Sequence, residues 1–459
     1  MTIAELEQIF TDQQAFRQLT ESIRPGSTVQ LASLVGSSLS LVAHGAIARL
    51  GGVHVLVAED RDAAGYLYND LYPLTGGEGL FFFPTGYKRS IQYGQEDPSG
   101  LVQRTTALNA LRSAADKPLI LCTYPEALTE KVADRERLSD SVLKLRRGDN
   151  LSTAFVEEAL RECRFERVEF VCEPGQYSVR GGIVDIFSYS DNKPYRIDFF
   201  GDEIDSIRPF DVGTQLSTGT LDEVEIVPNL KTVTSVEHRV SLARFAGEVT
   251  YWIADGDYTL KRFDDIRTKI LGDLDEPSSI DTLVTSRKGF LSDAKKAAFV
   301  LLRDNVRERP AEVRVAFDTT PQPEFNKKFD LLADDINANR LRGYSTCLLS
   351  DNKAQIERLS NIFNSIGEKN VVFDSVPLAL HAGFVDHTSK NCFYTDHQIF
   401  DRYQRYRIRG ELDRSESLTI QELNSLKVGD YVVHIDHGVG RFGGCPVPAV
   451  FPPRQVLPP

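Results

Sequence analysis

The pattern of apolar and polar positions is most regular in residues 173–217, which we expect to form a β-meander. Across residues 195–199 an apolar side chain stands at every second position and a charged one lies between, the two-residue period of a strand with one buried face. Shorter apolar runs flank it, separated by the dipeptides GG and GD, which close short hairpins. The pattern predicts three strands, with Arg180 beside Gly181 and Gly182.

The N-terminal part of the chain shows continuous apolar runs separated by a helical period. Residues 28–35 are typical of a buried strand, residues 39–50 of a helix, and residues 53–58 of the next buried strand. Another buried strand is predicted at residues 118–123. Strands that are buried on both faces and joined through helices are typical of parallel sheets. We therefore expect an α/β fold with a doubly wound parallel sheet, whose first strand-to-helix turn is the place for a P-loop.

A P-loop requires a glycine, four residues, and then Gly-Lys-Ser/Thr in that turn. Counted from Gly36, the positions of the second glycine, the lysine and the hydroxyl hold Leu41, Val42 and Ala43. The first lysine of the chain is Lys88. Without the ammonium and the hydroxyl, phosphates and Mg²⁺ lack their usual ligands. We expect a degenerate P-loop that binds no cofactor.

The remaining pattern predicts an α+β module inserted into the first domain, and a separate small α/β domain after it. Residues 128–147 are predicted to be a helix of mixed charge, and residues 291–302 a helix in the second half of the first domain. In the small domain, Asp334 and Asp335 could suggest a metal site. They lie within a helical pattern, where adjacent side chains point about 100° apart, so a solvated helix face is the better interpretation.

Composition and charge narrow the classes of function. The formal net charge is −13 and the pI is about 5.2, which argues against DNA binding by the whole surface but leaves a local basic face open. Six cysteines occur without a CxxC motif, so we expect neither a zinc site nor a disulfide framework. The N-terminus lacks the apolar core of a signal peptide and no apolar run reaches the length of a membrane span, so we expect a cytoplasmic protein.

The run YSVRGGIVDIF, followed by YRIDFFGDEIDSIRPFD, resembles a strand pair of two bacterial repair families. One is UvrB, the helicase subunit of excision repair. The other is the transcription-repair coupling factor, whose N-terminal third copies the UvrB damage-recognition module. In both families this meander belongs to a small domain that docks on UvrA. UvrB has an intact P-loop and the coupling factor does not, so the degenerate turn at residues 36–43 favours the coupling factor.

Near the C-terminus, VGDYVVHIDHGVGRF resembles the start of the CarD-like RNA-polymerase-binding domain of coupling factors. Residues 445–459 contain six prolines, which cannot continue the sheet of a barrel. We therefore expect only the beginning of a CarD-like β-barrel, truncated at residue 459. Together with the hydrophobic pattern, the resemblance implies this order: the first half of a UvrB-like domain at 1–125, an inserted UvrA-binding α+β domain at 126–213, the second half at 214–322, a small α/β domain at 323–413, a linker at 414–425 and the truncated CarD-like domain at 426–459.

The resemblance also implies which residues contact UvrA. The Arg180–Gly181 pair matches the family's Arg-Gly, and a planar guanidinium suits a bidentate contact with a carboxylate. Arg164 and Arg167 lie just upstream and could share its face, and Phe187 could be an apolar anchor. A solvated edge charge is the alternative interpretation of Arg180, and burial in the core is the alternative for Phe187.

The resemblance implies the N-terminal portion of a coupling factor that recruits UvrA to stalled RNA polymerase in transcription-coupled nucleotide excision repair. We expect this chain to bind and not to catalyse, because the ATP-dependent DNA translocase with its ATP and Mg²⁺ would belong to the missing part of the intact protein. Contact with the RNA polymerase β subunit is expected only in the intact protein, where contact with DNA also stays open. The alternative is a UvrB-type DNA helicase, an ATP-dependent repair enzyme, which the missing lysine disfavours.

Overall fold

A computed structural model of the chain describes ten stretches of it: residues 1–87, 97–113, 117–230, 238–273, 280–303, 309–365, 371–408, 429, 431–434 and 438–441. They belong to two units, residues 1–410 and residues 411–459.

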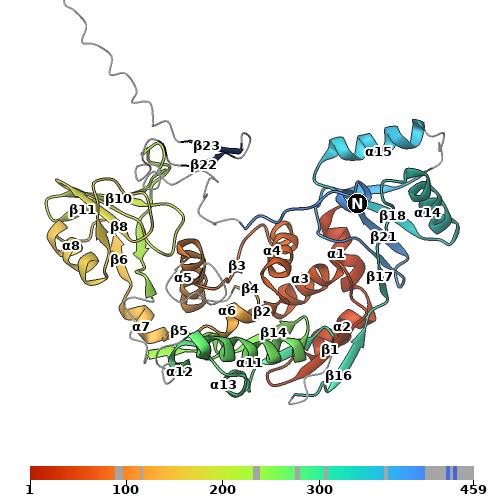
Figure 1. Cartoon of the computed structure of the whole chain (residues 1–459), viewed down its shortest axis with the longest axis horizontal. Helices are drawn as coiled ribbons and strands as arrows, with labels where there is room; N and C mark the ends of the chain where they lie inside the picture. The colour runs from red at the N-terminus through yellow and green to blue at the C-terminus, as the bar shows by residue number, and fades with distance from the viewer. Residues whose placement is uncertain are drawn as a thin grey trace, which may run out of the picture. The chain divides into compact units, whose positions relative to one another are not determined.

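Seven parallel strands form the large sheet of the first unit (Figure 1), as the buried apolar runs predict. Four of them precede residue 124 and three follow residue 248, so the chain leaves this sheet and returns to it. In spatial order they are β16 (Val313–Ala316), β1 (Thr28–Ala32), β15 (Ala298–Leu301), β14 (Val249–Ile253), β2 (Val53–Val57), β4 (Leu119–Thr123) and β3 (Leu80–Phe82).

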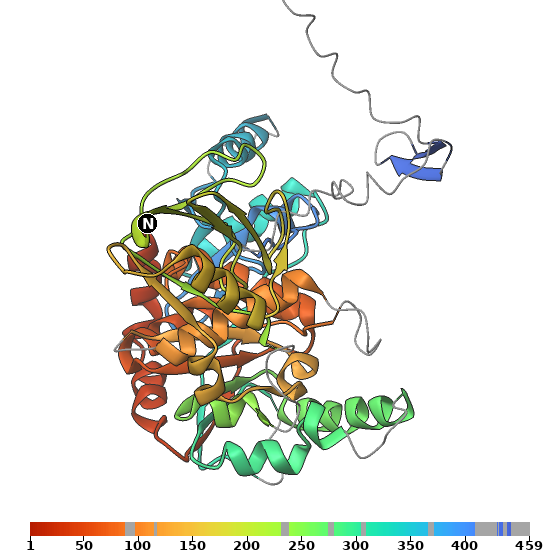
Figure 2. The same cartoon turned by 90° about the vertical axis from the view of Figure 1, so that its left-hand side faces the viewer.

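Helices lie on both faces of the large sheet, with α3 and α4 on one side and α11 and α13 on the other (Figures 1 and 2). The helices of this part are α1 (Ile3–Thr11), α2 (Gln14–Ser22), α3 (Ser38–Leu50), α4 (Arg61–Thr75), α5 (Pro98–Ser113), α6 (Pro125–Thr129), α10 (Leu242–Ala246), α11 (Gly256–Asp273), α12 (Ile280–Leu283) and α13 (Arg287–Asp293).

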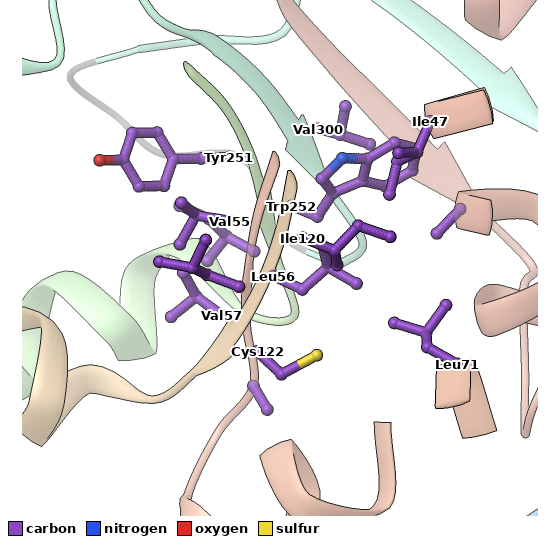
Figure 3. Packing of buried hydrophobic residues seen from close by; sticks show 14 of the residues in the cluster. Ile47, Val55, Leu56, Val57, Leu71, Ile120, Cys122, Tyr251, Trp252 and Val300 are labelled. Atoms are coloured by element: carbon purple, nitrogen blue, oxygen red, sulfur yellow. The ribbon is translucent and has the colours of Figure 1, made fainter. Parts of the chain in front are cut away.

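Two neighbouring residues of β14 show how the sheet fills both layers. Tyr251 and Trp252 are fully buried and point to opposite faces, because successive side chains of a strand alternate (Figure 3). Trp252 lies on the side of Ile47 and Leu71, from α3 and α4. The Tyr251 ring contacts that of Phe290 from α13, with 5.3 Å between the ring centroids. One central strand thus joins the two helical layers.

The buried polar groups on the Trp252 face satisfy one another. Trp252 Nε1 donates to His54 Nδ1 at 3.1 Å, and His54 Nε2 lies 2.8 Å from the carbonyl oxygen of Gly51. This pairing requires a neutral imidazole with its proton on Nε2. Burial lowers the pKa of His54 to about 4, so the ring is neutral at pH 7 and fits the arrangement.

The inserted module contains a second sheet, in the order β11–β10–β9–β8–β7. Its strands pair antiparallel except for β7 and β8, which are parallel. The elements of this region are β5 (Val132–Ala133), α7 (Arg135–Asp140), β6 (Leu143–Arg146), α8 (Thr153–Glu162), β7 (Glu166–Arg167), β8 (Gln176–Arg180), β9 (Ile183–Ile186), β10 (Tyr195–Phe200), β11 (Glu203–Pro209), β12 (Glu223–Ile226) and β13 (Arg239–Val240).

Two helix predictions are wrong. Residues 128–147 are split among α6, β5, α7 and β6, because β5 and β6 find partner strands in β13 and β12, more than 75 residues downstream. The predicted helix at residues 291–302 contains β15, which lies between β1 and β14. A short, fully apolar run such as residues 297–302 cannot be assigned by periodicity alone.

A third sheet, in the order β17–β20–β21–β18–β19, follows the large one in the chain. Asp334 is exposed on its helix α14, whereas Asp335 accepts a hydrogen bond from the Tyr394 hydroxyl at 2.6 Å. The part of the chain that the structure describes has no group of three or more His, Cys, Asp or Glu that could hold a metal ion. The elements are β17 (Thr319–Pro321), α14 (Phe329–Leu341), β18 (Ser345–Leu349), α15 (Lys353–Ser365), β19 (Asp374–Val376), β20 (Phe384–Asp386), β21 (Asn391–Thr395) and α16 (Asp396–Ile399).

In the second unit the structure describes one antiparallel hairpin, β22 (Tyr431–His434) with β23 (Gly438–Arg441). The proline-rich stretch at residues 445–459 lies outside the described residues. Across the described parts of both units, every helix is too short or too polar to span a membrane.

After α16 the chain runs back over α4 as a strap, residues 402–408. Tyr406 donates to Asp62 Oδ1 at 2.8 Å, and its ring lies against the backbone of Gly65, where a Cβ would come within 2.5 Å of a ring carbon. Ile408 is buried in the core of the large sheet. The absence of a side chain at Gly65 thus leaves room for the Tyr406 ring of the strap.

We predict that Gly65→Ala displaces Tyr406 and lowers the free energy of unfolding by about 1–2 kcal/mol, since a steric insertion of this kind outweighs the helix propensity that alanine adds. Urea unfolding measures the change, and faster tryptic cleavage at Arg405 and Arg407 reports release of the strap. The control is Gly272→Ala on α11, where a Cβ meets no atom within 4 Å and stability should stay equal or rise. Equal effects of the two substitutions would contradict the claim that Tyr406 needs the space at Gly65.

Candidate functional site

Arg180 lies on the outer face of the module's five-stranded sheet. The register places Ser178, Asp185, Arg196 and Arg208 in one row across β8, β9, β10 and β11. Arg180 stands two residues beyond Ser178 on β8, and therefore on the same face. The opposite face packs into the module's own apolar core. The charged side chains of the meander thus gather on the side that is free of this core.

A buried carboxylate organises this face. The Asp185 side chain is 1% exposed and accepts from Arg196 Nε at 2.8 Å and from Arg196 Nη2 at 2.9 Å. Arg180 Nη2 also donates to Asp185. The hydrogen bond with Asp185 raises the pKa of the Arg196 guanidinium. Because Arg196 already satisfies the carboxylate in a bidentate manner, Arg180 is a second cation that keeps donors for another acceptor.

Arg180 is only partly covered, and an exposed aromatic ring lies beneath it. Its side chain is 38% exposed, and its guanidinium carbon lies 5.4 Å from the ring centre of Phe170. Phe170 is itself 55% exposed. A cation over an aromatic ring is held in place by the ring's negative face. Arg180 is therefore not a mobile edge charge but an oriented one, fixed by a carboxylate and a ring.

The diglycine shapes the surface beside Arg180. Arg180 pairs with Ile183 across a two-residue hairpin, in which Gly181 has a φ of +61°. Phe199 N–H donates to the Gly182 carbonyl at 2.7 Å, and a Cβ on Gly182 would come within 2.9 Å of the Phe199 oxygen. The hairpin can therefore approach the end of β10 closely.

The next residue of β10, Phe200, is 83% exposed, although nothing in the alternation marks it as more than the last apolar position of a strand. Phe170, Arg180, Ile183 and Phe200 are large exposed side chains around this hairpin, and we call them the docking patch.

The other predicted contact residues do not join the docking patch. Arg167 on β7 is in register with the inward-facing Tyr177, on the face opposite Arg180, and pairs with Glu157 at 2.7 Å. Arg164 is exposed but follows α8 with a φ of +59°, outside any strand. Phe187 is 1% exposed, which agrees with burial in the core, the alternative interpretation of this residue from the sequence. The exposed aromatic side chains of the docking patch are Phe170 and Phe200, which the sequence did not mark because apolar residues in and beside strands are usually buried.

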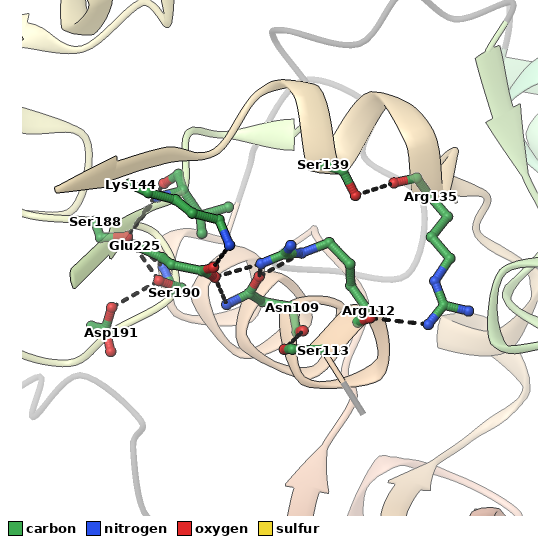
Figure 4. Close-up of polar contacts among 11 residues, drawn as sticks. Asn109, Arg112, Ser113, Arg135, Ser139, Lys144, Ser188, Ser190, Asp191 and Glu225 are labelled. Carbon is green, nitrogen blue, oxygen red and sulfur yellow. Dashed lines mark hydrogen bonds and ion pairs between the residues drawn. The ribbon is translucent and has the colours of Figure 1, made fainter. Parts of the chain in front are cut away.

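Polar contacts attach the module to α5 (Figure 4). Glu225 on β12 accepts from Arg112 and from Asn109 Nδ2 of α5, and its other oxygen lies 2.7 Å from Lys144 Nζ. Thr106 of α5 donates to the Ser190 carbonyl at 2.8 Å. Helix α5 follows β3, an edge strand of the large sheet, so the module is tied to that edge.

The degenerate P-loop, the turn between β1 and α3, is filled by a distant part of the chain. Ser37 N–H donates to the Ala382 carbonyl at 3.0 Å, and Ala382 N–H donates to Ser37 Oγ at 3.0 Å. Gly36 has a φ of +55°, as a tight turn requires. Leu41, Val42 and Ala43 are all buried in the core of the large sheet. The backbone donor at the start of the helix, which would face a phosphate, therefore has a carbonyl acceptor already.

A buried carboxyl group lies beside this contact. Asp70 accepts from the His381 N–H at 2.6 Å and from Ser40 Oγ at 3.2 Å. Burial raises the pKa of Asp70 to about 7, although hydrogen bonds, including one with the Ser37 side chain, oppose the shift. At neutral pH this group carries a partial negative charge and offers no attraction to an anion.

Comparison with known proteins agrees with the resemblance seen in the sequence. The family model described as the UvrB interaction domain matches residues 143–231, and that of the CarD-like/TRCF RID domain matches residues 426–455. The transcription-repair-coupling factor of Bacillus subtilis (strain 168) is 22% identical over 509 aligned positions, covering 94% of this chain. That of Staphylococcus aureus (strain bovine RF122 / ET3-1) is also 22% identical and covers 85%.

These alignments include 43% of the Bacillus subtilis relative and 40% of the Staphylococcus aureus one. The chain thus spans about two fifths of the length of the curated relatives it matches. Its similarity to transcription-repair-coupling factors extends over nearly all of the chain, and the UvrB interaction domain coincides with most of the inserted module.

The pKa of Asp70 leads to a prediction about stability and pH. The folded value of about 7 lies above the ordinary value of 3.8, so between pH 4 and pH 7 the folded state binds the proton that the unfolded state releases. Stability from this group is present at low pH and lost as the pH rises through 7. Relative to Asp70→Asn, the wild type should lose on the order of 4 kcal/mol from pH 4 to pH 8, at about 1.4 kcal/mol per pKa unit.

Urea unfolding of both proteins across this pH range measures the difference. The comparison removes to first order the contributions of His381 and His397, which both proteins share. A stability difference that is constant with pH would show that Asp70 is ionised in the fold throughout.

Proposed function

We propose that the chain is the UvrA-recruiting part of a transcription-repair coupling factor, and that it acts by binding instead of by catalysis. The similarity along nearly the whole chain and the match to the UvrB interaction domain support this role. On this proposal the protein works in the cytoplasm, in transcription-coupled nucleotide excision repair, where its module brings UvrA to a stalled RNA polymerase.

The single observation that carries the UvrA proposal is the docking patch within the matched domain. Arg180 is oriented by Asp185 and Phe170 and still has free surface, so its remaining N–H groups can pair with a carboxylate of UvrA. Phe170, Ile183 and Phe200 supply apolar surface around it. An arginine among exposed aromatic side chains is the composition typical of strong contact residues in protein interfaces.

The match at residues 426–455 supports a second contact. We propose that these residues belong to a domain that contacts the RNA polymerase β subunit in a longer protein. ATP, Mg²⁺, DNA translocation and any contact with DNA are proposed for other parts of that protein.

For this chain we propose no nucleotide hydrolysis. Val42 and Ala43 stand where a P-loop holds its lysine and its hydroxyl. Ser37 N–H donates to the Ala382 carbonyl, and the Asp70 carboxyl lies nearby. These observations weigh against the alternative of a UvrB-type helicase, whose chemistry needs phosphates and Mg²⁺ held in this turn.

The nucleotide proposal predicts that Mg-ATP gives no binding heat in titration calorimetry, or a Kd weaker than about 1 mM. UvrB, with an intact loop, is the positive control. Low-micromolar affinity for Mg-ATP would overturn the proposal and restore the helicase alternative.

The UvrA proposal predicts that Arg180→Ala weakens binding of purified UvrA by about ten- to a hundred-fold. This range corresponds to the loss of a hydrogen bond to a charged group, about 1.5–3 kcal/mol. The fold should survive with a small decrease in Tm, because Asp185 keeps its two bonds from Arg196. Biolayer interferometry with immobilised UvrA measures the affinity.

Arg146→Ala is the matched control, since Arg146 is an exposed arginine of the same module that pairs with Glu223 at 2.9 Å on another sheet. UvrA affinity should stay at the wild-type value in this variant. Equal affinities of both variants, with both proteins folded, would move the UvrA contact away from the docking patch.

A further inference from the structure

The degenerate P-loop and the third sheet are joined at one small contact. Residues 381–383 precede β20, and their backbone forms the reciprocal pair of hydrogen bonds with Ser37. His381 N–H donates to Asp70, and the His381 ring stacks on Tyr66 of α4 with 3.7 Å between ring centroids. Both the turn and the helix behind it therefore hold this segment, which we call the plug.

Close approach of the plug to the turn depends on Gly36, and close packing of the plug within the third sheet depends on Gly383. A Cβ on Gly36 would lie 2.9 Å from the Gly383 oxygen and 3.0 Å from the Ala382 oxygen. A Cβ on Gly383 would lie 1.9 Å from Gln322 Oε1 and 2.7 Å from the Phe393 oxygen. Distances below 3.0 Å are not tolerated without movement of the backbone, so neither position accepts a side chain in this arrangement.

Apolar packing and further hydrogen bonds surround the plug. Leu380 and Phe384 belong to the same buried cluster as the helices of the large sheet, and the Phe384 ring contacts Phe10 at 5.8 Å. Gln13 Nε2 donates to the buried Asp386 at 2.8 Å. Val35 N–H, in the degenerate turn itself, donates to Thr319 Oγ1 of β17 at 3.1 Å. The third sheet is therefore attached to the turn by β17 and by the segment that precedes β20.

We propose that the plug is an internal substitute for a nucleotide: it occupies the former phosphate turn and makes the large sheet and the third sheet unfold as one cooperative unit. In a P-loop protein the phosphate satisfies the backbone donors of the turn and holds it in shape. Here the Ala382 carbonyl accepts from Ser37 N–H. The close contact of Gly36 with Ala382 and Gly383 fills the space that a phosphate would take. This gives residues 319–400 a role: they keep the turn closed without any ligand.

The test uses the whole chain and compares two alanine substitutions at glycines with positive φ. Gly36→Ala pushes against the plug, whereas Gly76→Ala, at the end of α4 with a φ of +66°, meets no atom within 4 Å. Both carry the strain of a positive φ, so the difference between them reports the plug alone. Hydrogen exchange by mass spectrometry follows the third sheet, and fluorescence of Trp252, the single tryptophan, follows the large sheet.

We expect the amides of β18 and β21 to exchange about ten-fold faster or more in Gly36→Ala, while Trp252 still reports a folded large sheet. In the wild type and in Gly76→Ala the two sheets should open together. Ser37→Ala removes the acceptor of Ala382 N–H together with the hydrogen bond between the Ser37 side chain and Asp70. It should shift exchange in the same direction by a smaller factor, and it serves if Gly36→Ala does not fold. Joint opening of both sheets in Gly36→Ala and Ser37→Ala would overturn the proposal.

The result of the hydrogen-exchange experiment is independent of the result of the Mg-ATP titration. A nucleotide that binds elsewhere would overturn the proposed absence of nucleotide binding and leave the plug intact. Separate opening of the two sheets in the wild type would overturn the plug and leave the nucleotide proposal unchanged.

Discussion

The pairing of β14 with β2 is the contact on which the rest of the first unit depends. It joins residues 249–253 to residues 53–57 in parallel register, across nearly two hundred residues of intervening chain. Only this return places Trp252 against His54 and gives the two helical layers a common sheet. Closing a loop of this length costs only slightly more entropy than closing a short one, and a compact insertion with its own core can bring the two ends of the loop together. The inserted module, with a separate apolar cluster, is such an insertion.

The module's separate core also decides which side chains of its meander stay exposed. The apolar face of its sheet packs into the module's own core. The ion pair between Glu225 and Arg112 of α5 connects the module to the edge of the large sheet. The outer face of the meander is left with charged side chains, of which Asp185 and Arg196 neutralise each other. Arg180 then acts as an oriented cation whose position is set by its neighbours.

The turn between β1 and α3 has a tight geometry although Leu41, Val42 and Ala43 stand at the P-loop positions. The strand, the tight turn at Gly36 and the helix remain, because they are part of the core packing through Val42 and Ala43. What the ligand would have supplied, an acceptor for the turn's backbone donor, comes from Ala382 instead. A backbone donor that is buried without an acceptor is costly, so a turn that holds no phosphate needs another acceptor.

The sequence by itself determined the parallel sheet, the meander with its hairpin at Gly181 and Gly182, and the absence of a P-loop lysine, because periodicity and turn chemistry are local properties. It did not determine that residues 128–147 break into strands, nor that β15 lies in the middle of the large sheet, because those strands form only when distant partners supply their hydrogen bonds. In the candidate site, Arg180 could be predicted from the sequence. The burial of Phe187, just after β9, and the exposure of Phe170, between β7 and β8, and of Phe200, at the end of β10, are decided by tertiary packing.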